Sequence, residues 1–212
     1  MHKYMGQSIA EKLGELTGIG PEEKEVVAYG LEYLLSSTIG IVLTLLTGLL
    51  LGLFQETLAV LFCWGILRLF AGGAHCTAFW RCTIVSCAGM IATVLLTKGA
   101  FSLVPAVIWV TASTVWTLLA VWIWAPNNSE RPVSNPQRRK QLRSRALSLV
   151  LTTGLILFYF AFSGSENLQA LAAAGATGFA AGALMISPPG FSLIGWCDKK
   201  LELFAPFFQE RR

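Results

Sequence analysis

Residues 68–82, RLFAGGAHCTAFWRC, bring two arginines, a histidine and two cysteines together between two apolar runs. The chain has two histidines, His2 and His75, and His75 is the one inside this segment. A thiol with an imidazole partner is a recurring activated nucleophile, in which the histidine takes the thiol proton. The segment therefore has the residue types of a cysteine-based active site.

His75 and Cys82 are seven residues apart, which restricts how they can meet. In an unbroken helix they would share a face but lie about 10.5 Å apart along the axis, too far for a hydrogen bond of about 3 Å. Contact between them therefore requires a break in the chain. Gly72 and Gly73 can supply the break, because glycine adopts backbone conformations that strain other residues.

The start of the following helix is a favourable place for a thiolate. If this helix begins near Thr77 or Phe79, the His75 imidazole can lie over the first turn, which carries Cys82. Unpaired backbone amides, the helix dipole and the nearby Arg81 stabilise negative charge there. We therefore predict that Cys82 is the nucleophile and that His75 is its base.

The other cysteines have simpler interpretations. Free cysteine usually behaves as a small buried hydrophobic residue, so we expect Cys63, Cys87 and Cys197 to serve packing. For Cys76, packing is also favoured over a chemical role. The chain has no Cys-x-x-Cys pair and no paired ligands at short, regular spacing. We therefore expect reduced thiols, no metal site and no cofactor.

The composition indicates the environment of this segment. Hydrophobic residues make up 54% of the 212 and charged residues 13%, which is far from the usage of soluble domains. Because a bilayer core requires about 20 apolar residues per spanning helix, and period-2 alternation is absent, we predict an all-α integral membrane bundle. It forms one domain, residues 1–212, with six spans at roughly 31–53, 57–69, 79–97, 103–124, 146–162 and 168–186.

The second span and the two terminal segments differ from the other predicted helices. The second span is short, which suggests a segment that is tilted, partly re-entrant, or broken at Gly72 and Gly73. Residues 1–20 and 192–212 are amphipathic, and we expect both to lie on the membrane surface.

Basic residues are distributed unevenly between the loops, although the net charge is only +4. Arg68 and Arg81 flank the loop between the second and third spans, and each must be compensated near hydrocarbon or reach lipid phosphates. Six more basic residues crowd the predicted loop between the fourth and fifth spans: Arg131, Arg138, Arg139, Lys140, Arg143 and Arg145. Under the positive-inside rule both loops, and with them the candidate site, face the cytoplasm, and no nucleic-acid partner is indicated.

The order of these motifs resembles a known family. Arg68, Gly72-Gly73-Ala74-His75 and Cys82 are followed, one span later, by Ala125-Pro126 and Arg131-Pro132 ahead of a basic run, and Tyr29-Gly30-Leu31-Glu32 enters the first span. This pattern resembles the accessory gene regulator B (AgrB) family of bacterial membrane peptidases, which process the precursor of a cyclic signalling peptide. The similarity extends over nearly the whole chain.

The resemblance implies a membrane cysteine endopeptidase of quorum sensing. His75 and Cys82 match the family's catalytic pair, and Arg68 and Gly73 match positions that are important around it. The implied partners are a short precursor peptide with an acidic C-terminal tail, the lipid bilayer and a second copy of the chain. Glu32 is a candidate for orienting His75, since a carboxylate that enters a membrane span needs a partner, although it can also stay solvated at the interface.

Two interpretations from other classes remain open at this point. In a small membrane carrier or peptide exporter without peptidase activity, Glu32, Gln55, Arg68 and His75 would line a translocation path. In a purely structural membrane partner of a sensor kinase, neither the thiol nor the imidazole would matter.

Overall fold

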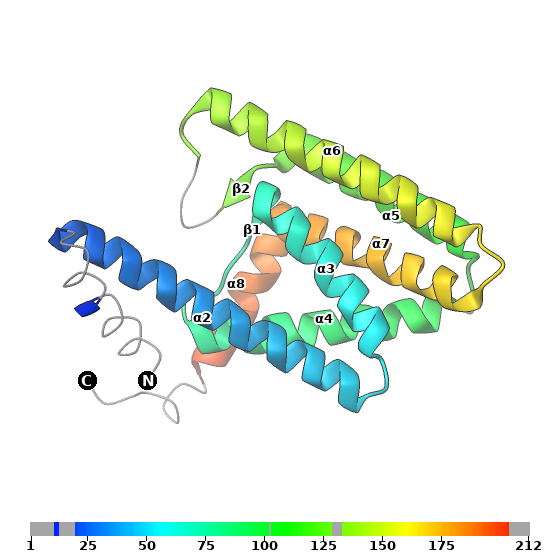
Figure 1. The fold of residues 1–212 in the computed structure, drawn as a ribbon, viewed down its shortest axis with the longest axis horizontal. Coiled ribbons are helices and arrows are strands. Elements are labelled where there is room, and N and C mark those ends of the chain that lie inside the picture. The colour runs from blue at the N-terminus through cyan, green and yellow to red at the C-terminus, as the bar shows by residue number, and fades with distance from the viewer. Residues whose placement is uncertain (1–10, 13–19, 102, 129–132, 204–212) are drawn as a thin grey trace. The chain divides into compact units, whose positions relative to one another are not determined.

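A computed structural model describes residues 11–12, 20–101, 103–128 and 133–203 of the chain. The described part is almost entirely helical, so the all-α prediction is confirmed (Figure 1). Its long helices are α2 (Pro21–Leu50), α3 (Phe54–Ala71), α4 (Phe79–Phe101), α5 (Ala106–Trp124), α6 (Pro136–Ala161), α7 (Glu166–Ile186) and α8 (Pro188–Glu202).

Five of these helices, α3 to α7, are long and apolar enough to cross a membrane. They correspond to the second to sixth predicted spans. The predicted first span, 31–53, falls largely in α2, where the apolar stretch Ser37–Leu50 is shorter than a full crossing. Length and composition therefore make the chain a membrane protein with at least five candidate spans in its described part.

The chain forms two compact units, Met1–Leu43 and Thr44–Arg212, and the candidate site lies in the second. Within this unit α7 is the central helix, with α5 and α6 along one side and α4 along the other (Figure 1). The helix α3 also packs directly against α7. This arrangement explains why α7 is the most extensively buried of the five apolar helices.

Small residues let α3 and α7 approach closely. A Cβ atom on Gly178 would lie 2.6 Å from the carbonyl oxygen of Val60, so the two backbones are nearly in contact. Close approach of this kind is typical of packing between membrane helices, where small side chains leave room for van der Waals contact. Ala172 and Gly175 are buried in the same unit. These small residues therefore serve packing inside the bundle.

Five of the six basic residues predicted to lie in a loop after α5 are in a helix, and for these five the prediction is wrong. The sixth, Arg131, lies outside the described residues. Helix α6 begins at Pro136, so Arg138, Arg139, Lys140, Arg143 and Arg145 lie in its first turns. Asn135 caps this start, since its side chain accepts hydrogen bonds from the backbone of Gln137 and Arg138. Because arginine, lysine and glutamine are good helix formers, the helix extends well beyond its apolar part.

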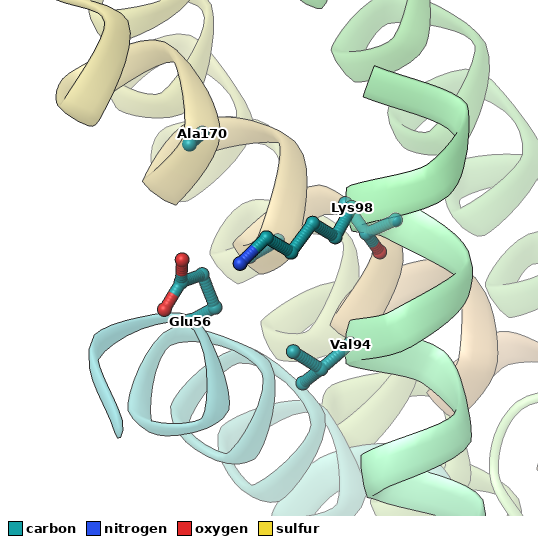
Figure 2. Close-up of a pocket in the computed structure, with 6 residues that line it drawn as sticks. Glu56, Val94, Lys98 and Ala170 are labelled. Atoms are coloured by element: carbon teal, nitrogen blue, oxygen red, sulfur yellow. The ribbon is translucent and has the colours of Figure 1, made fainter. Parts of the chain in front are cut away.

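A pocket of about 120 Å³ lies between α3, α4 and α7, and Glu56 and Lys98 extend toward it (Figure 2). Glu56 is in the first turn of α3 and Lys98 is in the last turn of α4. The residues of interest in segment 68–82 lie at the other ends of these two helices. This pocket is therefore not part of the candidate site.

The amphipathic segment near the C-terminus forms helix α8, which starts directly after α7. Most of its side chains are exposed, in agreement with the predicted surface helix, but Gly190, Ile194 and Asp198 are buried. These three are four residues apart and share one face. The rest of the two predicted surface segments, residues 1–10, 13–19 and 204–212, lies outside the described residues.

Candidate active site

The break between α3 and α4 begins at the two glycines, as predicted. Helix α3 ends at Ala71, and Gly72 and Gly73 have φ angles of 78° and 143°. The pair Gly72–Gly73 (β1) lies in a short parallel pairing with Asn127–Asn128 (β2), which follows α5. A positive φ is accessible to glycine at little cost, so the sequence pattern Gly-Gly has a direct conformational reason here.

The loop after the glycines is held by the end of α7. The backbone N–H of Ala74 donates to the carbonyl of Met185 at 3.0 Å, and the Asn127 side chain donates to the carbonyl of Ile186 at 3.0 Å. Helix α4 then begins at Phe79, one of the two predicted starts. The loop of residues 74–78 is therefore held at its start by α7 and at its end by the first turn of α4.

His75 and Cys82 come together across this loop. Nδ1 of His75 lies 4.0 Å from Sγ of Cys82, and both residues are half-buried. The contact is long but within the range of hydrogen bonds to sulfur. Because Cys82 is in the first turn of α4, its sulfur also lies near the positive end of the helix dipole.

Arg68, at the end of α3, fixes the other side of the imidazole. One of its nitrogens, Nη2, donates to the carbonyl of Ala74 at 2.6 Å and lies 2.9 Å from Nε2 of His75. A guanidinium has only donors, so Nε2 accepts in this arrangement. The neutral ring then carries its hydrogen on Nδ1, which is the nitrogen that faces Cys82. This arrangement suits a thiolate as the acceptor.

The Cys76 thiol lies in the loop beside the pair. It is buried, and a hydrogen bond with Cys82, followed by burial itself, raises the pKa of Cys76 well above its ordinary value. Cys76 therefore stays protonated at neutral pH. As the protonated partner of the two, it can serve as a hydrogen-bond donor to Cys82.

Arg81 is buried and does not reach outward to lipid phosphates. Its Nε lies 3.2 Å from Oδ1 of Asp198 on α8, and its Nη2 donates to Oγ1 of Thr77 at 2.7 Å. Asp198 also accepts from the backbone N–H and the hydroxyl of Thr77 at 3.2 and 2.8 Å. Sequence reasoning missed Asp198. The available signal was that it is the only aspartate of the chain.

The remaining predicted residues fall in two places. Gly73 lies beside Arg68: a Cβ atom on it would be 3.6 Å from the guanidinium carbon. Glu32 is in α2, in the unit Met1–Leu43, and its side chain lies outside the described residues, so its role stays a prediction. In the part of the chain that the structure describes, no three histidine, cysteine or acidic side chains are grouped to hold a metal ion.

Several apolar helices, with a thiol–imidazole pair where two of them meet, define a polytopic membrane protein with a candidate nucleophilic site. The chain belongs to the accessory gene regulator B family, whose model matches residues 6–186. Arg68, Gly73, His75 and Cys82 lie within this range.

Relatives of known sequence are similar over much of their length. The AgrB-like protein 2 of Clostridium perfringens strain 13 is 27% identical over 172 residues, which cover 75% of this chain and 79% of that protein. An AgrB-like protein of Listeria welshimeri is 30% identical over 139 residues, 64% of this chain and 66% of that protein. No solved structure matches the chain.

Proposed function

We propose that the protein is a membrane cysteine endopeptidase that removes the C-terminal tail of a short signalling-peptide precursor and closes the remaining part into a ring. Membership of the accessory gene regulator B family supports a role in processing a quorum-sensing peptide. The single observation that carries the peptidase mechanism is the approach of His75 Nδ1 to Cys82 Sγ at 4.0 Å, in a ring oriented by Arg68.

The proposed first step is attack of the Cys82 thiolate on a precursor carbonyl. A carbon–sulfur bond forms and the carbon–nitrogen bond to the tail breaks. The departing amine takes a proton from His75 in its doubly protonated form, in which the ring holds the proton released by the Cys82 thiol, and the tail leaves with a new amino end. The precursor then remains on Cys82 as an acyl thioester.

Ring closure follows from a second nucleophile within the precursor. A cysteine thiol or a serine hydroxyl attacks the thioester, its proton passes to His75, and Cys82 is released as the thiolate. The product is a thiolactone or a lactone. Water competes for the thioester, so the ring forms only if the internal nucleophile is held close in a largely dry site, as a membrane interface allows.

Arg68 has two roles in this scheme. Its positive charge offsets the negative charge of the Cys82 thiolate, and its contact with Nε2 orients the imidazole. When His75 carries hydrogens on both nitrogens, Nε2 becomes a donor that faces another donor. Arg68 then keeps its bond to the Ala74 carbonyl and gives up the ring contact. The contact therefore belongs to the states in which the imidazole is neutral.

We also propose that the site faces the cytoplasm and that the basic start of α6 attracts the acidic tail. Arg138, Arg139, Lys140 and Arg145 are exposed in this region. A cluster of like charges raises the local concentration of an oppositely charged segment, with an effect that falls with ionic strength. A homodimer in the bilayer remains part of this proposal, and no nucleic-acid partner is included.

The test is release of the tail from a synthetic precursor. The full chain is placed in lipid vesicles with the peptide encoded by a short reading frame beside its gene, one with an internal cysteine or serine and an acidic tail. Cys82→Ala should abolish tail release, and Cys87→Ala, five residues further along α4, should retain it. A thioester adduct on Cys82 should be detectable by mass spectrometry.

Two outcomes would contradict the proposal. Undiminished cleavage by Cys82→Ala would assign the nucleophile elsewhere. Transport of the intact precursor without cleavage by the wild type would favour the carrier interpretation.

A further inference from the structure

We propose that Asp198 is a positioning residue, which acts from α8 through Thr77 and Arg81 to keep His75 facing Cys82. The inference builds on the proposed function, because it names a residue that supports the same site. It concerns a helix outside the region that identifies the family, since the matching model ends at residue 186 and α8 begins at Pro188.

Asp198 contacts both ends of the segment that joins His75 to Cys82. It accepts hydrogen bonds from the backbone N–H and the hydroxyl of Thr77, which is two residues after His75. It also pairs with Arg81, the residue immediately before Cys82. The two contacts span 117 to 121 residues of sequence, so α8 joins the loop as a separate support.

The three residues form a closed set of contacts. The Thr77 hydroxyl donates to Asp198 and accepts from Nη2 of Arg81, and Nη1 of Arg81 donates to the backbone carbonyl of Asp198 at 3.2 Å. One carboxylate therefore fixes a loop residue and the first turn of α4 relative to each other. His75 and Cys82 are on these two parts, so their separation depends on the carboxylate.

The burial of Asp198 and Arg81 indicates that Asp198 positions the site. Asp198 and Arg81 are only 7% and 8% exposed, although charged residues are rarely fully buried. Removing two charges from water costs free energy that their attraction often fails to recover, so a buried pair is poor evidence of a stabilising role. A pair that adds little stability but fixes the geometry beside a nucleophile is better explained by positioning.

The rest of α8 is shaped to bring Asp198 to this place. A Cβ atom on Gly190 would overlap the carbonyl oxygen of Leu184, so α8 turns back tightly against α7. Four residues on, Ile194 packs with Ala74 and Cys76 of the site loop. Asp198 follows after another four residues, on the same face. The buried side of α8 thus covers the loop from one end to the other.

The test compares Asp198→Asn and Thr77→Val with Lys199→Gln, an exposed neighbour on α8, in the full chain in lipid vesicles. The first readout is the rate of Cys82 alkylation by iodoacetamide as a function of pH, measured by peptide mass mapping. His75→Ala supplies the reference profile of a Cys82 without its partner. The second readout is kcat and KM for tail release from the synthetic precursor.

Positioning predicts that Asp198→Asn and Thr77→Val acquire the His75→Ala alkylation profile, whereas Lys199→Gln keeps the wild-type profile. It also predicts that kcat falls about 10- to 100-fold with KM nearly unchanged, the size expected for one hydrogen bond to a charged group. If Asp198→Asn fails to fold, Thr77→Val decides the question, since it keeps both buried charges and removes only the two contacts of the hydroxyl, one with Asp198 and one with Arg81.

A wild-type alkylation profile in folded Asp198→Asn or in Thr77→Val would overturn the inference. So would identical profiles of the wild type and His75→Ala, because His75 would then not act on Cys82 in the resting protein. The alkylation arm needs no substrate. Absence of tail release by the wild type would therefore defeat the proposed function and leave the positioning role to be decided by alkylation.

Discussion

Replacing Arg68 by methionine should slow the reaction of Cys82 with iodoacetamide about tenfold at pH 7. Arg68→Met keeps an apolar side chain but removes the donor to Nε2 of His75 and the positive charge that lies over the Trp64 ring. A hydrogen bond to a charged group contributes about 1.5–3 kcal/mol, which corresponds to about 10- to 150-fold in rate. Arg68 is half-buried, so water replaces part of the loss and the lower end applies.

The assay uses the full chain in lipid vesicles and follows the modified Cys82 peptide by mass spectrometry. Lys98→Met removes the same charge at the other end of α4 and should leave the rate unchanged. Arg68→Lys should recover part of the loss, because an ammonium restores the charge without the planar donor group. Wild-type reactivity in Arg68→Met, together with slow reaction in His75→Ala, would refute the proposed role of Arg68 in orienting the ring.

Three further predictions follow from the same geometry. Gly73→Ala should lower tail release, because a φ of 143° costs an alanine about 1–3 kcal/mol and shifts the loop, whereas Gly89→Ala, with open space around it, should not. Cys76 should be alkylated more slowly than free cysteine at pH 8, since its raised pKa keeps it protonated there. In Cys82→Ala the alkylation of Cys76 should accelerate, because the hydrogen bond with Cys82, the largest cause of the raised Cys76 pKa, is then absent. An unchanged rate of Cys76 alkylation would contradict this cause. Gly178→Val should lower the melting temperature more than Gly89→Ala, since a side chain there meets the backbone of α3; equal melting temperatures would show that α3 and α7 separate easily.

The sequence determined the parts of this protein that depend on near neighbours. The Gly72-Gly73 pair predicted the end of α3, because only glycine accepts both positive φ angles at little cost. The end of one apolar run and the start of the next predicted α4 to begin near Phe79. With the helix break and the helix start known, the spacing of His75 and Cys82 allowed them to meet, and the structure brings them together.

Only the tertiary structure decided which distant groups surround the pair. Arg68 and Arg81 looked alike in sequence, but one contacts the imidazole and the other is buried against a carboxylate more than a hundred residues away. The pairing of Arg81 with Asp198 depends on how α8 folds back on α7, which hydropathy does not specify. An amphipathic pattern gives the apolar face of a helix, but it does not identify the residue that a buried aspartate will meet, because that is set by packing of the whole bundle.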